Sequence, residues 1–532
     1  MAGRSAFALA LAAFLLAAGA SSARADEPRQ GGTLNYVAPY GSSFSSLDIH
    51  ASAQIQDAIW SKAIHKPLYD WDADANQPVL ALATDVAASD DGLVYTYKLR
   101  QDVYFHNGKQ MTADDIIWTY TRIMDPQKAY PSARFIRYIK GAAEYSEGKA
   151  EAISGLKKID DFTLEITFTD PMDPAYLLMR NVTSIYPKDE GNSEEFLKHP
   201  IGVGPYKFAE YVPGSRLTVE RWEKYFDSGK PYLDKVNIMI MGDASARDVA
   251  FRNKEIDVSV LGPAQYVAYK ADPEMSKYIL EVPEVFTRFV GFNLDYEPFK
   301  DKRVRQAINY AIDSDLIIKR LAKDKAYRAT SWLPISSPAY DKDAKPYPYD
   351  PEKAKELLKE AGYAEGFEFE LTATQNESWG LTIVEAIIPM LAKVGITVKA
   401  KPVESSVLSE VVPAGDFQAF MWSYTSGPDP LTALLNFHSE TPQSSGNYEK
   451  FNNPDYDKLI DAAKQARNED EKNELLRQAN NLLQEEAPMW FFNYNKAVIA
   501  YQPWLHGAQP NSMEIALQSY EKIWFDESAP SR

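Results

Sequence analysis

The sequence predicts a mixed α/β protein of several domains, and three observations lead to this prediction. Apolar residues alternate at 93–99 and 162–168, which indicates strands with one buried face. Amphipathic stretches with helix-capping residues alternate with such strands along the chain. The length of 532 residues corresponds to two to four domains at ~100–200 residues per domain. No repeat or low-complexity linker separates these segments, so we expect short crossings between domains.

Capping residues place several of the helices. Thr112 precedes an amphipathic stretch with acids in its first turn, where the helix dipole favours them. Asp350 is expected to cap another helix, in which Pro351 takes the first position and Gly362 follows the end. In the segment 301–313, apolar residues recur at helical spacing.

The first residues predict a secretory signal peptide at 1–25. Arg4 precedes an apolar run at 6–20, and Ala23-Arg24-Ala25 matches an A-x-A site, so cleavage is expected before Asp26. A membrane anchor is the alternative, but a span needs ~20 apolar residues. We therefore expect a periplasmic protein, with secretion into the medium as the second possibility.

Composition excludes several classes of function. The chain has a formal net charge of −18, which repels nucleic acid and anionic lipid. It has no cysteine, which excludes disulfides, thiol catalysis and Cys-ligated metals. His106 and His438 are isolated in the sequence, whereas metals need several ligands. We expect a monomer with no cofactor and no metal.

Four segments, taken in order, resemble one family. They begin LATDVAASDDGLVYTYKLRQDVYFHNGKQ at 82, IGVGPYKFAEYVPGSRLTVERW at 201, VGFNLDYEPFKDKRVRQAINYAID at 290 and GPDPLTALLNFHSETPQSSGNYEKFNNPDYDKLIDAA at 427. The chain resembles the family 5 extracellular solute-binding proteins of ABC importers, which include oligopeptide-, dipeptide- and nickel-binding proteins. The resemblance runs from the GGTL start to Gly507.

The resemblance implies a two-lobed α/β periplasmic-binding-protein fold of type II, with an extra domain and a hinge between the lobes. It divides the mature chain into three parts. The first lobe is discontinuous and comprises 26–68, 190–288 and 502–532. The extra domain, attached to the first lobe, comprises 69–189, and the second lobe comprises 289–501. The resemblance also implies a binder, not an enzyme. The lobes would close on a peptide-like or related polar solute and dock on permease subunits in the inner membrane.

The stretch MWSYTSGPDP, from 421 to 430, is expected to be a loop, because Gly427, Pro428 and Pro430 break a helix. As in the family, this loop is expected to form one wall of the cleft. Trp422 and Tyr424 offer flat apolar faces with polar edges, while Thr425 and Ser426 offer hydroxyls. The alternative is that Trp422 belongs to the core, at the end of a strand.

This stretch departs from the family pattern in one respect. Family members that bind a free α-amine resemble W-x-x-D here, and the acid pairs with the ammonium. This chain has Tyr424 and Thr425 at that place, and Asp429 is expected to cap a helix beginning at Pro430. Ordinary dipeptides are therefore in doubt. Neutral polyols, opine- or oligosaccharide-like solutes, modified peptides and longer peptides stay open.

The opposite wall is expected from the loop at 40–48. By position in the family, Ser43, Phe44 and Ser45 are candidates for solute contact, with a plain surface loop as the alternative. Arg134 is a candidate for an anionic end of the solute, with a solvated helix face as the alternative. Asn293, which follows the strand entering the second lobe, completes the candidates.

Two other functions are alternatives to a transport receptor. A secreted hydrolase would need a positioned acid pair or a nucleophile motif, and no G-x-S-x-G or H-E-x-x-H is present. A receptor that presents solute to a chemoreceptor would use the same cleft, so the sequence does not separate it from transport.

Overall fold

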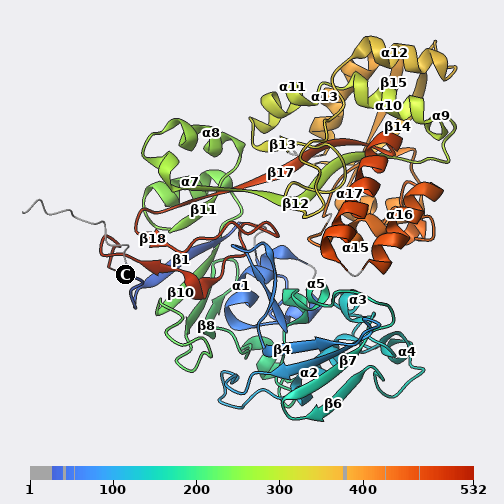
Figure 1. The fold of residues 1–532 in the computed structure, drawn as a ribbon. Coiled ribbons are helices and arrows are strands. Elements are labelled where there is room, and N and C mark those ends of the chain that lie inside the picture. Colours follow the sequence, from blue (N-terminus) through green and yellow to red (C-terminus); the bar gives the residue numbers. More distant parts are fainter. Residues whose placement is uncertain are drawn as a thin grey trace, which may run out of the picture.

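The computed structural model describes residues 27–39, 43–52, 54–375, 380–425, 427–466 and 468–531. The predicted signal peptide lies outside these residues. In Figure 1 the second lobe lies at the upper right, and the extra domain lies at the bottom. Within the described part of the chain, no helix combines the length and apolar character that a membrane crossing requires.

The first lobe is built on a four-stranded sheet in the order β1-β10-β9-β8, in which β1 and β10 are parallel and the other pairs antiparallel. Its elements come from both ends and the middle of the chain: β1 (Thr33–Ala38), η1 (Ile49–Ala51), α1 (Ile55–Ile64), α6 (Glu194–Lys198), β8 (Tyr206–Val212), β9 (Arg216–Arg221), β10 (Lys235–Ile240), α7 (Ala244–Arg252), β11 (Val258–Val260), α8 (Pro263–Ala271), η3 (Met275–Tyr278), β18 (Leu505–His506), η6 (Tyr520–Lys522) and β19 (Trp524–Phe525).

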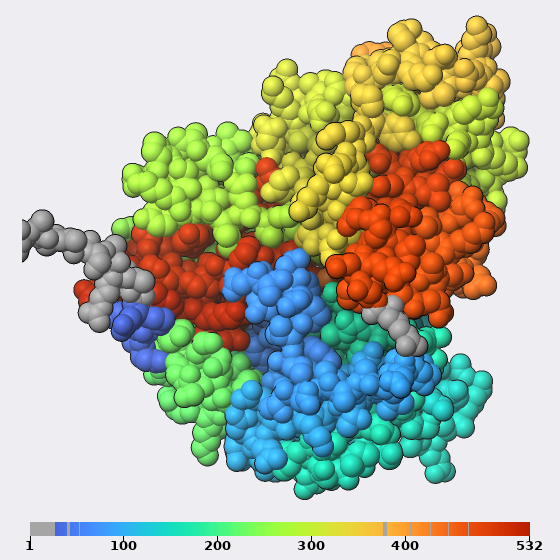
Figure 2. All heavy atoms as spheres, in the orientation of Figure 1, coloured from blue at the N-terminus to red at the C-terminus, as the bar shows by residue number. Residues whose placement is uncertain are grey.

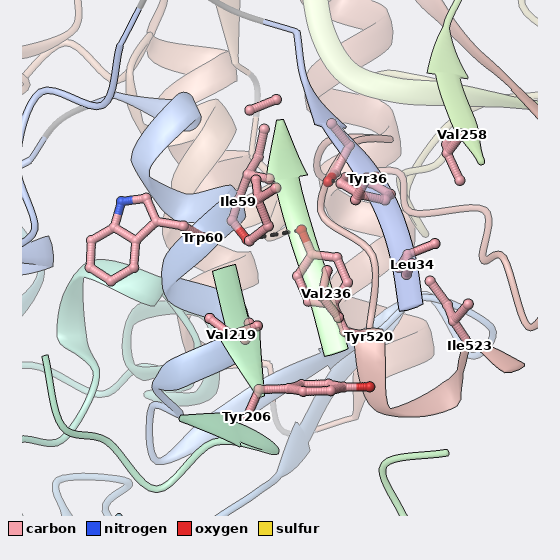
Figure 3. Close-up of a cluster of buried hydrophobic side chains, with 14 of the residues drawn as sticks. Leu34, Tyr36, Ile59, Trp60, Tyr206, Val219, Val236, Val258, Tyr520 and Ile523 are labelled. Atoms are coloured by element: carbon pink, nitrogen blue, oxygen red, sulfur yellow. Dashed lines mark hydrogen bonds between the residues drawn. The ribbon is translucent and has the colours of Figure 1, made fainter. Parts of the chain in front are cut away.

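The core of this lobe joins segments that are far apart in the sequence. Figure 3 shows Trp60 and Ile59 of α1 packed with sheet residues and with Tyr520 of the C-terminal segment. The Tyr520 hydroxyl donates to the Ile59 carbonyl at 3.0 Å, and both residues are buried. Burial of large side chains from the two chain ends therefore holds a discontinuous lobe together.

The extra domain contains a four-stranded antiparallel sheet in the order β4-β5-β7-β6 and a separate β2–β3 hairpin. Thr112 and Asp115 form a capping box at the start of α2, which confirms the predicted helix start. The elements are β2 (Tyr69–Asp72), β3 (Gln77–Leu80), β4 (Ala83–Ala88), β5 (Val94–Leu99), α2 (Ala113–Ile123), α3 (Ala133–Ile136), α4 (Ala142–Ser146), β6 (Leu156–Asp160), β7 (Thr163–Thr167), α5 (Ala175–Leu178) and η2 (Asn181–Thr183).

The second lobe surrounds most of a seven-stranded sheet, in the order β11-β17-β12-β16-β14-β15 with β13 on β17. Asp350 caps α12 as predicted. The elements are β12 (Ile279–Phe292), α9 (Glu297–Lys300), α10 (Lys302–Ala311), α11 (Ser314–Ile317), η4 (Ile318–Ala322), β13 (Ala326–Arg328), α12 (Pro351–Glu360), β14 (Phe367–Thr374), α13 (Leu381–Ala392), β15 (Ile396–Val403), α14 (Ser405–Ala414), β16 (Ala419–Thr425), α15 (Pro430–Leu435), η5 (Gln443–Ser445), α16 (Pro454–Gln465), α17 (Glu469–Glu486) and β17 (Met489–Tyr501).

Two long antiparallel strands, β12 and β17, run through both lobes (Figure 1). Their pairing shifts between Pro283 and Thr287, where the ladder has a bulge. At this bulge the buried Glu284 carboxylate accepts from the Asn495 amide and from the Ile515 N–H. The crossing therefore combines a break in strand pairing with bonds to the C-terminal segment of the first lobe. The domain bounds predicted from the sequence stay a prediction.

Two of the motifs that carried the family resemblance bind each other. The Nε2 atom of His106 lies 3.0 Å from the Gly204 carbonyl, and the Gly202 N–H donates to its Nδ1 at 3.2 Å. A Cβ at either glycine would collide with the backbone around Ile64. The HNG turn and the GVG turn thus form one structural contact.

Candidate ligand-binding site

The strand β16 reaches further than the sequence indicated. It continues through Tyr424 to Thr425, so Trp422 and Tyr424 are strand residues and not loop residues. Alternation along the strand places Ala419 and Met421 in one core cluster of the second lobe. Trp422 and Tyr424 lie on the opposite face.

We call Trp332, Trp422, Tyr424 and Tyr448 the aromatic wall. The ring centroids of Trp422 and Tyr448 are 5.9 Å apart and stacked, and those of Trp422 and Tyr424 are 5.5 Å apart and edge-on. Trp332 stacks on Tyr424 at 6.3 Å. Trp332 is buried, whereas the other three rings are half-buried. Packing thus fixes each ring while three of them keep an accessible surface.

The turn after β16 uses its polar groups locally. The Thr425 hydroxyl accepts from the Gly427 N–H at 3.0 Å. The Asp429 carboxylate accepts from the N–H groups of Leu431 and Thr432 at 3.2 and 3.1 Å, which confirms the predicted cap of α15. Ser426 lies outside the described residues. The Asp429 carboxylate is therefore engaged at a helix N-terminus.

The candidates of the N-terminal loop are engaged differently. Phe44 is 7% exposed and packs in the first-lobe core, 5.7 Å from the ring of Tyr211. The Ser45 N–H and hydroxyl both donate to the buried Asp57 carboxylate, the first at 2.9 Å, and the Ser52 hydroxyl donates to it at 2.6 Å. Ser43 is exposed. This loop is folded onto α1, and its solute contacts stay a prediction.

The other two candidates lie apart from each other. Asn293 is buried, its amide donates to the Phe417 carbonyl at 2.9 Å, and its carbonyl accepts from the Asp295 N–H. The structure thus gives Asn293 a role in holding the end of β12 to the short segment that leads into β16. Arg134 is exposed on α3 of the extra domain, with its guanidinium over the ring of Phe135.

The two lobes meet beside the aromatic wall. The Asn76 amide, at the tip of the β2–β3 hairpin, donates to the Ser336 carbonyl of the second lobe at 3.0 Å, and its carbonyl accepts from Ser512. A narrow gap here is lined by Trp71 and Asn76 on one side and by Ser336, Gly427 and Pro428 on the other. The loop after β16 therefore faces the extra domain across the cleft, where Figure 2 shows the lobes in contact.

Acidic side chains also approach across this boundary. The pKa of Asp173, just before α5, is raised because burial removes water from its carboxyl and because Asp429 and Glu469 of the second lobe add negative charge. The same two acids contribute to a raised pKa of Tyr176. The extra domain thus meets like charge from Asp429 and Glu469 of the second lobe, partly offset by the positive charge of Lys472.

Sequence reasoning missed a buried carboxyl behind the wall. Glu449 is fully buried beside Phe420, and neither carboxyl oxygen has a hydrogen-bond partner among the residues that the structure describes. Burial raises the pKa of Glu449 to about 8. A Cβ at Gly291 would collide with this carboxyl, so glycine in β12 makes room for it. Within the described ranges, no group of three potential metal-ligating side chains occurs.

Comparison with known proteins shows which family the chain resembles. The family described as bacterial extracellular solute-binding proteins, family 5 Middle, matches residues 77–445. The dipeptide-binding protein of Escherichia coli K12 is 29% identical over 453 residues, which are 80% of this chain and 83% of that protein.

Solved structures share the fold. The unliganded open form of the periplasmic murein tripeptide-binding protein MppA gives a TM-score of 0.80 at 23% identity and covers 94% of this chain and 98% of its own. The binding protein AgaA of A. tumefaciens R10, in complex with agropinic acid, gives 0.72 at 24% identity, with 94% and 99% covered. The chain therefore belongs to the family 5 bacterial extracellular solute-binding proteins, non-enzymatic binders that serve ABC importers.

Proposed function

We propose that this protein is a periplasmic receptor that closes its lobes on a polar solute without using a free ammonium group, and that it delivers the solute to permease subunits in the inner membrane. The observation that carries the proposal is the aromatic wall. It offers three half-buried rings and the Thr425 hydroxyl, while Asp429 is engaged as a helix cap.

The solute classes follow from this surface. Rings with fixed positions stack on flat or apolar parts of a solute, and hydroxyls bond to its amides or alcohols. An ammonium held in a closed cleft would need a carboxylate partner, because an unpaired buried charge costs several kcal/mol. Modified peptides, opine-like conjugates and oligosaccharide-like solutes therefore fit better than ordinary dipeptides. The related structure in complex with agropinic acid shows that the fold accepts a solute outside the peptide class.

The mechanism is hinge closure. A solute that touches both lobes binds the closed state better than the open state, so it shifts the population toward closure. The strand break at Pro283–Thr287 is suited to absorb the change, because few ladder bonds connect β12 and β17 there. The closed face would then dock on the permease, and no bond of the solute would break in the receptor.

A thermal-shift screen tests the proposal on protein produced from Asp26 onward. The protein is unfolded and refolded to strip bound solute, then screened with di- to pentapeptides, opines and oligosaccharides. A solute at 100 times its Kd should stabilise the protein by about 2.7 kcal/mol, and small-angle scattering should show compaction. Stabilisation by free-amine dipeptides alone would reject the proposed solute class. Absence of compaction with every stabilising solute would reject the receptor mechanism.

A further inference from the structure

Two arginine side chains of the extra domain converge on one phenyl ring. The guanidinium carbon of Arg134, on α3, lies 4.7 Å from the ring centroid of Phe135, and that of Arg180, just after α5, lies 5.5 Å from the same centroid. Guanidinium groups stack favourably on aromatic faces, so the ring fixes both of them. The two cations are thereby held near each other.

Neither guanidinium has a counter-ion among the described residues. In the part of the chain that the structure describes, no carboxylate forms an ion pair with Arg134 or Arg180, and the buried Nε of Arg180 has no hydrogen-bond partner. Burial and, to a smaller extent, the positive charge of Arg134 together lower the pKa of Arg180 to about 10. By contrast, the buried Arg122 is bonded to the Asp48 carboxylate at 2.7 Å.

An arginine pair without a carboxylate partner is unexpected in an acidic protein. Acidic residues outnumber basic ones by 75 to 57 in this chain, so carboxylates are plentiful. A buried, unpaired charge destabilises a fold unless something pairs with it. Two adjacent cations that share no carboxylate therefore indicate a place for an anion that comes from outside the chain.

The arginine pair lies at the boundary of the cleft. The amide of Asn181, next to Arg180, donates to the Ala58 carbonyl of α1 at 3.1 Å, so this segment sits where the extra domain meets the first lobe. The negative charge of Asp429, at the start of α15, contributes to the raised pKa of Tyr176 on the preceding α5. Figure 1 shows α3 and α5 beneath α15, and Figure 2 shows the two lobes in contact there.

We propose that Arg134 and Arg180 bind an anionic group of the solute, a carboxylate or a phosphate, on the extra-domain side of the cleft. This inference rests on the proposed function and names its substrate class: an acidic solute whose amine is absent, blocked or left in water. Two planar guanidinium groups match a flat carboxylate or a phosphate bidentately. The aromatic wall of the second lobe would hold the remainder of the solute.

Small anions test the subsite without knowledge of the natural solute. The melting temperature of the stripped protein is measured in citrate and in inorganic phosphate, each against sodium chloride of the same ionic strength, which equalises general screening. We expect citrate, phosphate or both to stabilise the wild type more than chloride does. A carboxylate subsite predicts the larger shift with citrate, and a phosphate subsite predicts the larger shift with phosphate.

Four variants assign the effect to the pair. R134Q and R180Q should each weaken the apparent anion affinity about tenfold or more, because each removes charge-assisted hydrogen bonds. R180K keeps the charge and should retain part of the affinity, which guards against simple unfolding of R180Q. R137Q is the matched control: Arg137 ends the same helix and lies over Tyr138, outside the pair, so this variant should behave as the wild type.

The outcomes separate this inference from the proposed function. No anion-specific stabilisation of the wild type, or equal stabilisation of all variants, would overturn the arginine subsite. If neutral solutes compact the wild type and R134Q alike, the receptor function stands and the anionic substrate class falls. If the arginine pair binds citrate or phosphate but no solute compacts the protein, the subsite stands and the proposed function falls.

Discussion

The loop at 43–52 and the strand end at 422–425 have similar compositions, with rings set among hydroxyls, yet the structure uses them in opposite ways. In the loop, Phe44 is buried and the Asp57 carboxylate takes up the polar groups of Ser45 and Ser52. In the strand, Trp422 and Tyr424 stay half-buried on the surface of the sheet.

The carboxyl groups behind the two segments explain the difference. Asp57 is buried and accepts hydrogen bonds from loop donors, so it fixes the loop onto the first lobe. Glu449 is equally buried but has no hydrogen-bond partner among the described residues, and its pKa is raised to about 8. It draws no polar group of the wall inward. A ring-and-hydroxyl composition therefore predicts a binding surface only where no buried acceptor satisfies the hydroxyls.

The largest effect on stability is expected for Phe44→Ala. Truncating a fully packed phenyl ring leaves a cavity and should lower the free energy of unfolding by about 3 kcal/mol. Urea denaturation measures this loss. Solute affinity of the folded fraction should stay within the error of the wild type, because the ring faces Tyr211 in the core. A stable variant that loses solute affinity would instead make Phe44 a contact residue and erase the contrast between the two segments.

Glu449→Gln should change the pH dependence of stability. The folded protein keeps the Glu449 proton up to about pH 8, whereas the ordinary pKa is 4.5. The folded state thus binds more protons between these values, so this group lowers stability as pH rises from 4.5 to 8 and adds no further slope above 8. The neutral amide removes that loss, and at pH 7 we expect a gain of up to about 3 kcal/mol.

Denaturation in urea at pH 5, 7 and 9 measures the effect, with the exposed Glu440→Gln as the control for a general change of charge. The Glu440→Gln variant should show the same dependence of stability on pH as the wild type. An unchanged slope in Glu449→Gln would mean that Glu449 is ionised and paired in the folded protein. The supposed difference from Asp57 would then disappear.

Trp422→Ala should lower stability less than Phe44→Ala does, and it should lower solute affinity more. The indole is half-buried, so we expect a loss of about 1–2 kcal/mol. The stabilisation by any solute found in the screen should fall strongly, because the ring stacks with Tyr448 and supports Tyr424. Isothermal titration calorimetry gives the affinity directly. Retained affinity in this variant, together with lost affinity in Phe44→Ala, would reverse the roles of the two segments.

The sequence predicted those features that depend on neighbours along the chain. Thr112, Asp350 and Asp429 cap helices as expected, because a cap needs only N–H groups two or three residues away. Trp332 and Tyr448 were not predicted to join the wall, since their contacts depend on how β12, β16 and the intervening loops pack.

The same limit applies to charges. Arg134 was a candidate from the sequence, but Arg180 was not, because their shared ring and missing counter-ion arise only when α3 and α5 come together. Likewise, the residues around Ser45 in the sequence do not predict that the Asp57 carboxylate will accept hydrogen bonds from both its N–H and its hydroxyl. Local hydrogen bonds can be predicted from residue spacing, whereas satisfaction of polar groups at a site depends on the tertiary fold.

Asp173→Asn gives the smallest expected effect and concerns how the extra domain approaches the second lobe. The raised pKa of Asp173 reflects loss of water and the negative charges of Asp429 and Glu469. Ionised Asp173 therefore opposes closure, and protonation at lower pH relieves the repulsion. Because such groups interact partly through water, we expect a few tenths of a kcal/mol in favour of the compact state.

Small-angle scattering of the solute-free protein at pH 7 and pH 4.5 measures this effect. The wild type should become slightly more compact at the lower pH, and Asp173→Asn should be as compact at pH 7 as the wild type is when acidified. Asp170→Asn removes a nearby exposed charge and should change nothing. If the variant and the wild type show the same pH response, the acids do not oppose closure, and the arginine pair alone sets the electrostatics of the extra-domain face.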